Sequence, residues 1–165
     1  MIGHLTRGAA LAGALTLACA APALAAKGGA GTETLTEHIH GVTVFEAPAI
    51  DPCNGAPGTI AAVATNGVLH TTTHADGNLW ATGTIEGVVT FTPSEAGGVS
   101  ASGHFTAWFG EAVNEKNQIE HNTFNAQLTG TDGSRVSIHE NAHLSTNGHG
   151  EVTVSFENMR ATCTG

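Results

Sequence analysis

Three segments in the second half of the chain alternate polar and apolar residues with a period of two, at residues 118–128, 135–144 and 151–157. They are separated by the turn sequences Gly-Thr-Asp-Gly-Ser and Asn-Gly-His-Gly. A period of two is typical of β-strands with one buried face, and Gly, Asn and Asp accept the backbone angles that tight hairpin turns require. The pattern therefore predicts consecutive antiparallel hairpins.

The same alternation precedes these segments, and no stretch of the chain after its first residues shows a sustained helical period with caps. Turns are expected at Asn66-Gly67, at Asp76-Gly77 and at residues 114–117, with a bulge at Gly41 and kinks at Gly83 or Gly87. Five further strands are predicted, at residues 33–46, 59–65, 68–74, 79–92 and 99–110. The total is eight.

Eight sequential strands with short connections predict an all-β fold, an eight-stranded antiparallel up-and-down barrel of the architecture that lipocalins and avidin have. Closure is expected because it removes exposed sheet edges. The domain organisation is then a flexible leader at 26–32 and one barrel domain at 33–165. Cys53 and Cys163 are predicted to form one disulfide, since a barrel brings the first strand beside the last.

The first 25 residues have the features of a secretory signal peptide: a short charged start, an apolar run from 8 to 21, and Ala-Leu-Ala before the expected cleavage site. The protein is therefore expected to be secreted, with lipid anchoring at Cys19 as the alternative. No later run is apolar enough to predict a transmembrane segment. The formal net charge is −9, which disfavours nucleic acid as a partner.

Strand pairing can be predicted from the turns. A three-residue turn at 131–133 with Gly133 in the left-handed conformation places Phe124 opposite Glu140 and His121 opposite His143. A similar turn at 147–149 places Glu157 opposite His139 on the outer face and turns Phe156 inward. Glu120, Asn122 and Glu140 then point into the lumen with Phe124. This set predicts a binding site for a small apolar molecule with a few polar contacts. The alternative is that Glu120 and Asn122 lie in water at the mouth, while Glu140 is hydrogen-bonded and covered by side chains.

Residues 139–143 read His-Glu-Asn-Ala-His, which matches the zinc-peptidase pattern His-Glu-x-x-His. On a helix, His139 and His143 would share a zinc ion, Glu140 would activate its water and His149 would be a third ligand. On a strand, residues four apart are separated by about 13 Å, too far for one ion without a sharp bend. The alternation around the motif favours the strand. A weaker metal hypothesis remains there, a surface site formed by His121 and His143, with His139 nearby.

From Thr123 to His143, and again at 152–156, the chain resembles small secreted bacterial β-barrel proteins to which no activity is attached. The resemblance implies that the His-Glu-x-x-His sequence belongs to a strand. The sequence as a whole favours an exported, non-catalytic binding or structural module without a cofactor. The alternatives are a zinc-dependent hydrolase and a surface metal-binding protein, and the oligomeric state and the identity of any ligand stay open.

Overall fold

The computed structural model describes residues 31–165, and those residues contain eight β-strands and no helix. All strand pairs are antiparallel, as the sequence predicts. The predicted signal peptide, the Cys19 anchor and most of the predicted leader lie outside the described residues. The strands are β1 (Glu33–Ile39), β2 (Val42–Ile50), β3 (Pro57–Thr73), β4 (Leu79–Pro93), β5 (Ala101–Val113), β6 (Asn117–Gly130), β7 (Arg135–Asn147) and β8 (Val152–Thr164).

The eight strands are not the eight that the sequence predicts. The segment expected as one strand at 33–46 is divided into β1 and β2, whereas the two strands expected at 59–65 and 68–74 are one long strand, β3. Asn66-Gly67 is therefore not a turn. Gly67 is needed for packing instead, because a Cβ atom there would lie 2.6 Å from Ile85 Cγ2 and 2.9 Å from the Thr84 carbonyl oxygen. β4 also runs without interruption through Gly83 and Gly87.

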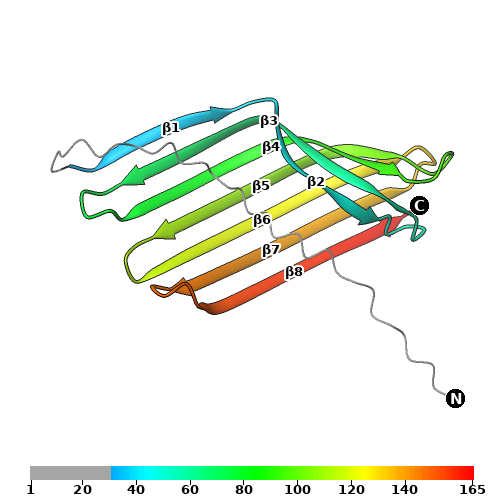
Figure 1. Cartoon of the computed structure of the whole chain (residues 1–165). Helices are drawn as coiled ribbons and strands as arrows, with labels where there is room; N and C mark the ends of the chain where they lie inside the picture. The colour runs from blue at the N-terminus through cyan, green and yellow to red at the C-terminus, as the bar shows by residue number, and fades with distance from the viewer. Residues whose placement is uncertain (1–30) are drawn as a thin grey trace, which may run out of the picture.

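β1 and β2 lie end to end along the same edge of β3. Between them the chain turns at Gly41, whose φ is +69°, and its N–H donates to the Ala64 carbonyl oxygen at 2.8 Å. β3 has a bulge at the same level, between Ala64 and Asn66 in its pairing with β4. A bulge bends its strand. β2 consequently leaves the line of β1 and crosses one face of the sheet (Figure 1).

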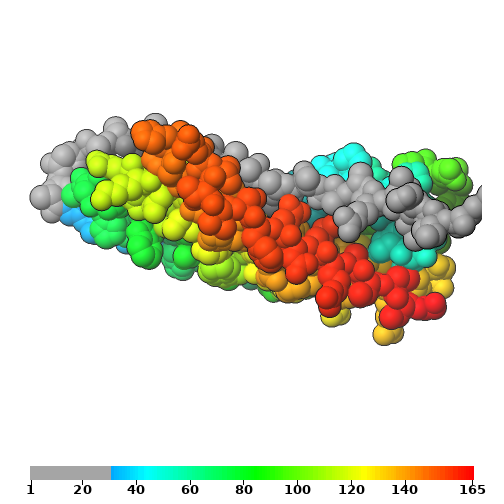
Figure 2. Space-filling view, turned by 90° about the horizontal axis from the view of Figure 1, so that it is seen from below, coloured from blue at the N-terminus to red at the C-terminus, as the bar shows by residue number. Residues whose placement is uncertain are grey.

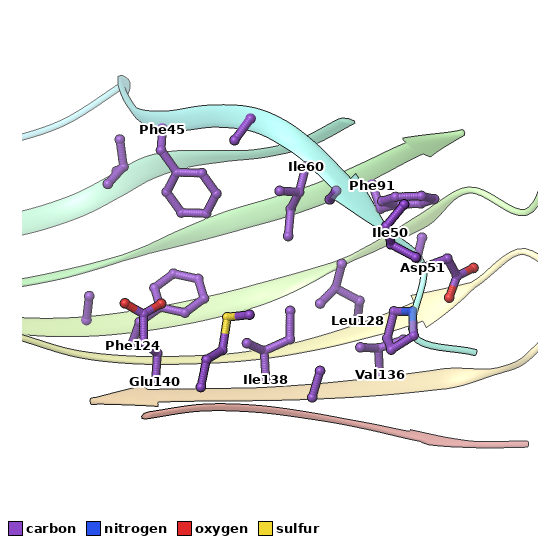
Figure 3. Close-up of a pocket in the computed structure, with 18 of the residues that line it drawn as sticks. Phe45, Ile50, Asp51, Ile60, Phe91, Phe124, Leu128, Val136, Ile138 and Glu140 are labelled. Atoms are coloured by element: carbon purple, nitrogen blue, oxygen red, sulfur yellow. The ribbon is translucent and has the colours of Figure 1, made fainter. Parts of the chain in front are cut away.

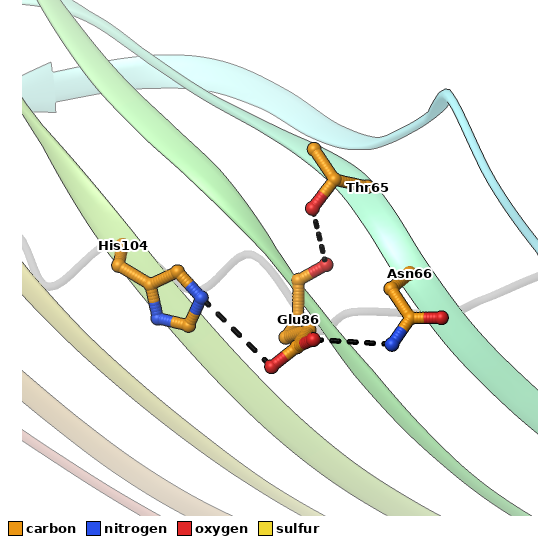
Figure 4. A network of polar contacts seen from close by, with 4 residues as sticks. All are labelled: Thr65, Asn66, Glu86 and His104. Atoms are coloured by element: carbon orange, nitrogen blue, oxygen red, sulfur yellow. Dashed lines mark hydrogen bonds and ion pairs between the residues drawn. The ribbon is translucent and has the colours of Figure 1, made fainter.

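Polar contacts on the opposite face hold this bulge (Figure 4). Asn66 Nδ2 donates to Glu86 Oε1 at 3.1 Å, and Thr65 Oγ1 donates to the Glu86 carbonyl oxygen at 3.4 Å. His104 Nε2 lies 4.0 Å from Glu86 Oε2. Glu86 thus connects three neighbouring strands where the sheet bends.

The closed barrel is not confirmed, because the sheet is open and its order is β1-β3-β4-β5-β6-β7-β8. The pairing pattern gives a reason. β1 and β2 lie in line and occupy one position in the sheet, so the order from β1 to β8 contains an odd number of strands. Neighbouring antiparallel strands alternate in direction. The two edges, β1 and β8, therefore run in the same direction. Direct closure would need a parallel pair of β1 and β8, and these strands are not paired.

The core lies on the face of the sheet that β2 crosses, called the inner face here. In β4 every second residue is buried, which is the alternation that the sequence predicts. Phe105 and Val89 are fully buried at the centre. The other buried core residues are Ala49, Ala62, Ala64, Ile85, Phe91, Ala107, Phe124, Ala126, Leu128 and Val136. The opposite, outer face carries mostly polar side chains.

The predicted disulfide is present. Cys53, in the loop after β2, is bonded to Cys163, and their Cα atoms lie 5.2 Å apart. Cys163 lies within β8, which continues to Thr164 rather than ending at 157 as the alternation predicted. The bond joins the end of β2 to the far edge of the sheet, near the C-terminus (Figure 1). Among residues 31–165 there is no helix that could span a membrane.

The predicted β6–β7 pairing is confirmed, and the predicted β7–β8 pairing is wrong. Phe124 faces Glu140 and Gly133 has a φ of +90°. In the next hairpin the left-handed residue is Gly150, and the register shifts again between Ser145 and Thr146. Ala142 consequently faces Glu157 instead of Val154. The observed register differs from the predicted one by three residues. Because this number is odd, side chains of β8 predicted on one face of the sheet lie on the other.

Candidate functional site

A cavity of about 340 Å³ lies between β2 and the inner face of the sheet (Figure 3). β2 forms one wall, and the opposite wall comes mainly from β5, β6, β7 and β8. Most of the lining is apolar. Its larger apolar side chains are Val44, Phe45, Ile50, Ile60, Phe91, Val99, Trp108, Phe109, Phe124, Leu128, Val136, Ile138 and Met159. A space of this kind suits a small, largely apolar molecule.

Aromatic rings fix one end of the cavity. The Phe45 ring on β2 meets the Phe124 ring on β6 edge to face, with centroids 5.7 Å apart. Phe124 in turn stacks on Phe105 at 5.4 Å. Because Phe105 is fully buried, these contacts connect the β2 wall to the centre of the core. Phe124, predicted as a ligand contact, is therefore both a cavity wall and a core residue.

Glu140 points into the cavity from β7, as predicted (Figure 3). It lies between Phe124 on β6 and Met159 on β8 in the strand register. Burial raises the pKa of the Glu140 carboxyl above its ordinary value, and the negative charge of Glu157 raises it further. Glu140 is thus the lining carboxyl that takes up a proton more readily than an ordinary glutamate.

Asn122 also lines the cavity, as predicted, and its Oδ1 atom is buried without a hydrogen-bond partner among the described residues. Leaving a buried acceptor without a donor costs free energy. Asn122 lies beside Phe109 on β5 and Ala142 on β7, neither of which has a side-chain donor. A bound molecule with an N–H or O–H group would satisfy this oxygen.

Glu120 shares the inner face but is not among the residues that line the cavity. It lies opposite Glu111 on β5, and Gln118 Nε2 donates to Glu111 Oε1 at 3.0 Å and to Glu120 Oε1 at 2.6 Å. Burial, followed by the charge of Glu120, raises the pKa of Glu111, although the Gln118 hydrogen bond opposes the rise. The structure therefore places this predicted ligand contact in a separate carboxylate pair.

Several residues of the site had no signal in the sequence. Asp51 is buried beside the cavity, and its Oδ1 accepts a hydrogen bond from the Cys53 N–H at 2.8 Å. The β2 wall was missed because its residues were expected within a loop or an ordinary first strand. The sequence does not predict Met159 as a lining residue, because the alternation ends at residue 157 whereas β8 continues to Thr164. The disulfide to the loop after β2 requires the Cys163 side chain to point to the inner face. This requirement is a sequence signal for the correct face of β8, because side chains alternate along a strand.

The His-Glu-x-x-His sequence lies within β7, so the prediction of a strand is confirmed and the helix that a zinc peptidase would need is not formed. His139 is held by two amides on the outer face. Its Nδ1 donates to Asn125 Oδ1 at 2.6 Å, and its Nε2 accepts from Asn141 Nδ2 at 2.8 Å. Glu140 points to the inner face. The residues of the motif are therefore not gathered around one point.

His121 and His143 form the cross-strand pair that the sequence predicts. Their Nδ1 atoms lie 2.9 Å apart, and the ring centroids lie 4.3 Å apart. Phe156 follows on β8 opposite His143, on the outer face and not in the core. Within residues 31–165 there is no group of three or more His, Cys, Asp or Glu side chains arranged to hold a metal ion.

Comparison of the chain with family models, with curated proteins and with solved structures finds no match.

Proposed function

We propose that this chain is an exported, non-catalytic module that binds a small, largely apolar molecule in the cavity between β2 and the inner face of the sheet. The observation that carries the proposal is the cavity itself, an apolar space of about 340 Å³ with Glu140 and Asn122 in its wall. Ligand sites combine such a lining with a few polar groups that fix orientation. The disulfide is compatible with export.

The proposal does not depend on a closed barrel. In a closed barrel the ligand is enclosed by strands on all sides. Here β2 crosses the inner face of the open sheet, and the Cys53–Cys163 bond ties the loop after β2 to β8. β2 supplies the wall that closure would otherwise supply.

The polar groups indicate what the molecule carries. Asn122 Oδ1 needs a donor. The lining contains Glu46, Asp51 and Glu140 and no Lys or Arg, and Glu157 is close enough to affect Glu140. An anionic group would meet these carboxylates without a counter-charge. The expected molecule is therefore neutral or cationic, with an apolar body and at least one N–H or O–H group.

Fluorescence titration with N-phenyl-1-naphthylamine tests this proposal, because that probe is apolar, neutral and has one N–H group. We expect saturable binding to one site. Asn122→Ala should weaken binding about tenfold, the cost of one hydrogen bond to a buried acceptor. Ala47→Trp should abolish binding, since Ala47 lines the cavity from β2.

Glu120→Gln is the matched control, because Glu120 lies on the same face outside the cavity. It should leave the affinity unchanged. If Ala47→Trp folds and binds the probe as tightly as the unsubstituted protein, the cavity is not the site.

A surface metal site at His121 and His143 is the second candidate function, and the 2.9 Å separation of their Nδ1 atoms favours it. Two nitrogens in tetrahedral zinc coordination lie roughly 3.3 Å apart at bond lengths of 2.0–2.1 Å, so a small rotation of the rings would suffice. Water would complete the coordination. Titration calorimetry with Zn²⁺ should show binding that His143→Ala removes and His139→Ala retains. Equal binding by the His143→Ala variant would exclude this site.

A further inference from the structure

The two edges of the sheet are built differently. The edge formed by β1 and β2 is interrupted at Gly41, has a bulge between Thr43 and Phe45, and contains Pro48, which has no N–H to donate. These are features that prevent an edge strand from pairing with another chain. β8 has none of them along its thirteen residues: it contains no Pro and no Lys, and its only irregularity is next to the turn.

Within residues 31–165, β8 pairs only with β7. Its other edge therefore offers a row of backbone N–H and C=O groups that no described strand uses. The sheet does not use them itself, because β1 is not paired with β8 and the disulfide ties β8 to the loop after β2 rather than to a strand. These groups are available to a strand from another chain.

β8 also exposes apolar side chains on both of its faces. Phe156 is 52% exposed and Val154 48% exposed on the outer face, and Met159 is 42% exposed on the inner face. Figure 2 shows β8, coloured orange to red, extending along the side of the molecule. A long edge strand with exposed apolar side chains is a typical site of strand addition, and the only charged residues of β8 are Glu157 and Arg160.

We propose that β8 pairs with β8 of a second copy of this chain, antiparallel and about a twofold axis at Asn158. With the twofold axis at Asn158, every residue of β8 lies opposite a residue of β8 in the second copy. An antiparallel pair of thirteen residues forms about 12 to 14 backbone hydrogen bonds. The inner faces of the two sheets then lie on the same side. The assembly goes beyond ligand binding and does not depend on it.

The charged side chains of β8 are compatible with this register. On the outer face it places Phe156 opposite Arg160 of the second copy, where the guanidinium can cover the aromatic ring. On the inner face Glu157 lies opposite Met159 and avoids a direct encounter with its own copy. Centring on Glu157 would instead place the two Glu157 side chains face to face, which like charges disfavour.

Light scattering on the exported mature protein, coupled to size exclusion, measures the oligomeric state. We expect twice the mass of the chain. The double variant Val154→Lys and Phe156→Lys should be a monomer, because charged residues on the outer face of an edge strand block pairing. It should still bind N-phenyl-1-naphthylamine, since both positions face away from the cavity, so failure of the dimer and failure of the ligand proposal are distinguishable.

Asn158→Cys tests the register. At the twofold axis the two introduced thiols would lie directly opposite, within the distance that a disulfide spans. A covalent dimer on a non-reducing gel, with the 158–158 bond identified by peptide mapping, is the expected result. Thr162→Cys is the matched control, because its copies would be about 27 Å apart and should not cross-link. A monomeric mass at all accessible concentrations would overturn the proposal, and so would a dimer that cross-links through Thr162→Cys instead.

Discussion

Cys53 and Cys163 are separated by 110 residues in the chain, yet their disulfide joins the loop after β2 to β8, the far edge of the open sheet. No backbone pairing connects these two parts of the structure. The bond is therefore the covalent constraint that keeps the β2 wall of the cavity opposite β7 and β8.

Replacing both cysteines by alanine should lower the free energy of unfolding by about 4 to 5 kcal/mol, because a loop of this length gains much entropy in the unfolded chain when it is no longer closed. Urea unfolding of the double variant and the unsubstituted protein measures the difference. The variant should also bind N-phenyl-1-naphthylamine more weakly if it remains folded. An unchanged midpoint together with unchanged probe binding would contradict this role of the disulfide.

The alternation of residues predicted the all-β class, the inner face of β6 and β7 and the position of Glu140, because burial of one face dictates each of them. Gly residues were harder to interpret. Asn66-Gly67 has the composition of a hairpin turn, but Gly67 is there because Ile85 leaves no room for a Cβ atom. Local sequence does not distinguish a glycine required by its own backbone from one required by a neighbour.

The register of β8 could not be predicted for a related reason. Gly148 and Gly150 can both adopt the left-handed conformation of a hairpin turn, and only Gly150 does so. That choice moves Phe156 outward and Glu157 inward. The hydrogen bonds that Asn147 Oδ1 accepts from the N–H groups of His149 and Glu151 stabilise the observed turn. Such contacts depend on the folded loop.

The raised pKa of Glu140 predicts a specific pH dependence of stability. A carboxyl whose pKa is higher in the folded than in the unfolded protein favours folding while it is protonated, and this contribution is lost as pH rises through the folded pKa. Glu140→Gln should therefore match the unsubstituted protein at pH 4 and be more stable at pH 7. The gain should be at most about 1 kcal/mol, because solvent reaches part of the carboxyl and screens its interactions.

Melting temperatures at the two pH values measure this effect. Glu95→Gln removes the same charge from an exposed position between β4 and β5 and controls for net charge. If the melting temperatures of both variants rise equally at pH 7, the effect is due to net charge and not to burial of Glu140.

The Phe105 side chain is fully buried and stacks on Phe124, so Phe105→Ala should lower the free energy of unfolding by about 3 to 5 kcal/mol. The residual cavity cannot collapse easily, because Phe124 is also held by Phe45. Trp80→Ala is the comparison: Trp80 is 61% exposed, and its loss should cost less than about 1 kcal/mol despite the larger side chain. Denaturant unfolding of both variants tests the contrast, and similar costs would show that the stacked rings are not the centre of the core.

Two glycines on β5 should respond oppositely to the same substitution. A Cβ atom at Gly103 would lie 1.7 Å from the Gln127 carbonyl oxygen and 2.7 Å from Leu128 Cα, so alanine there must push β5 and β6 apart. At Gly110 the nearest atoms are the ring carbons of Trp108 at 3.3 and 3.4 Å, and a side chain that is 45% exposed can move away.

Gly103→Ala should therefore cost about 3 kcal/mol or more, at the upper end of overpacking effects. Gly110→Ala should change stability by less than about 1 kcal/mol, because the clash is small and alanine restricts the unfolded chain. Thermal unfolding of the two single variants measures both. Because the two positions share a strand, a general intolerance of β5 to alanine would destabilise both variants alike. Only close contact between the β5 and β6 backbones at Gly103 predicts the difference.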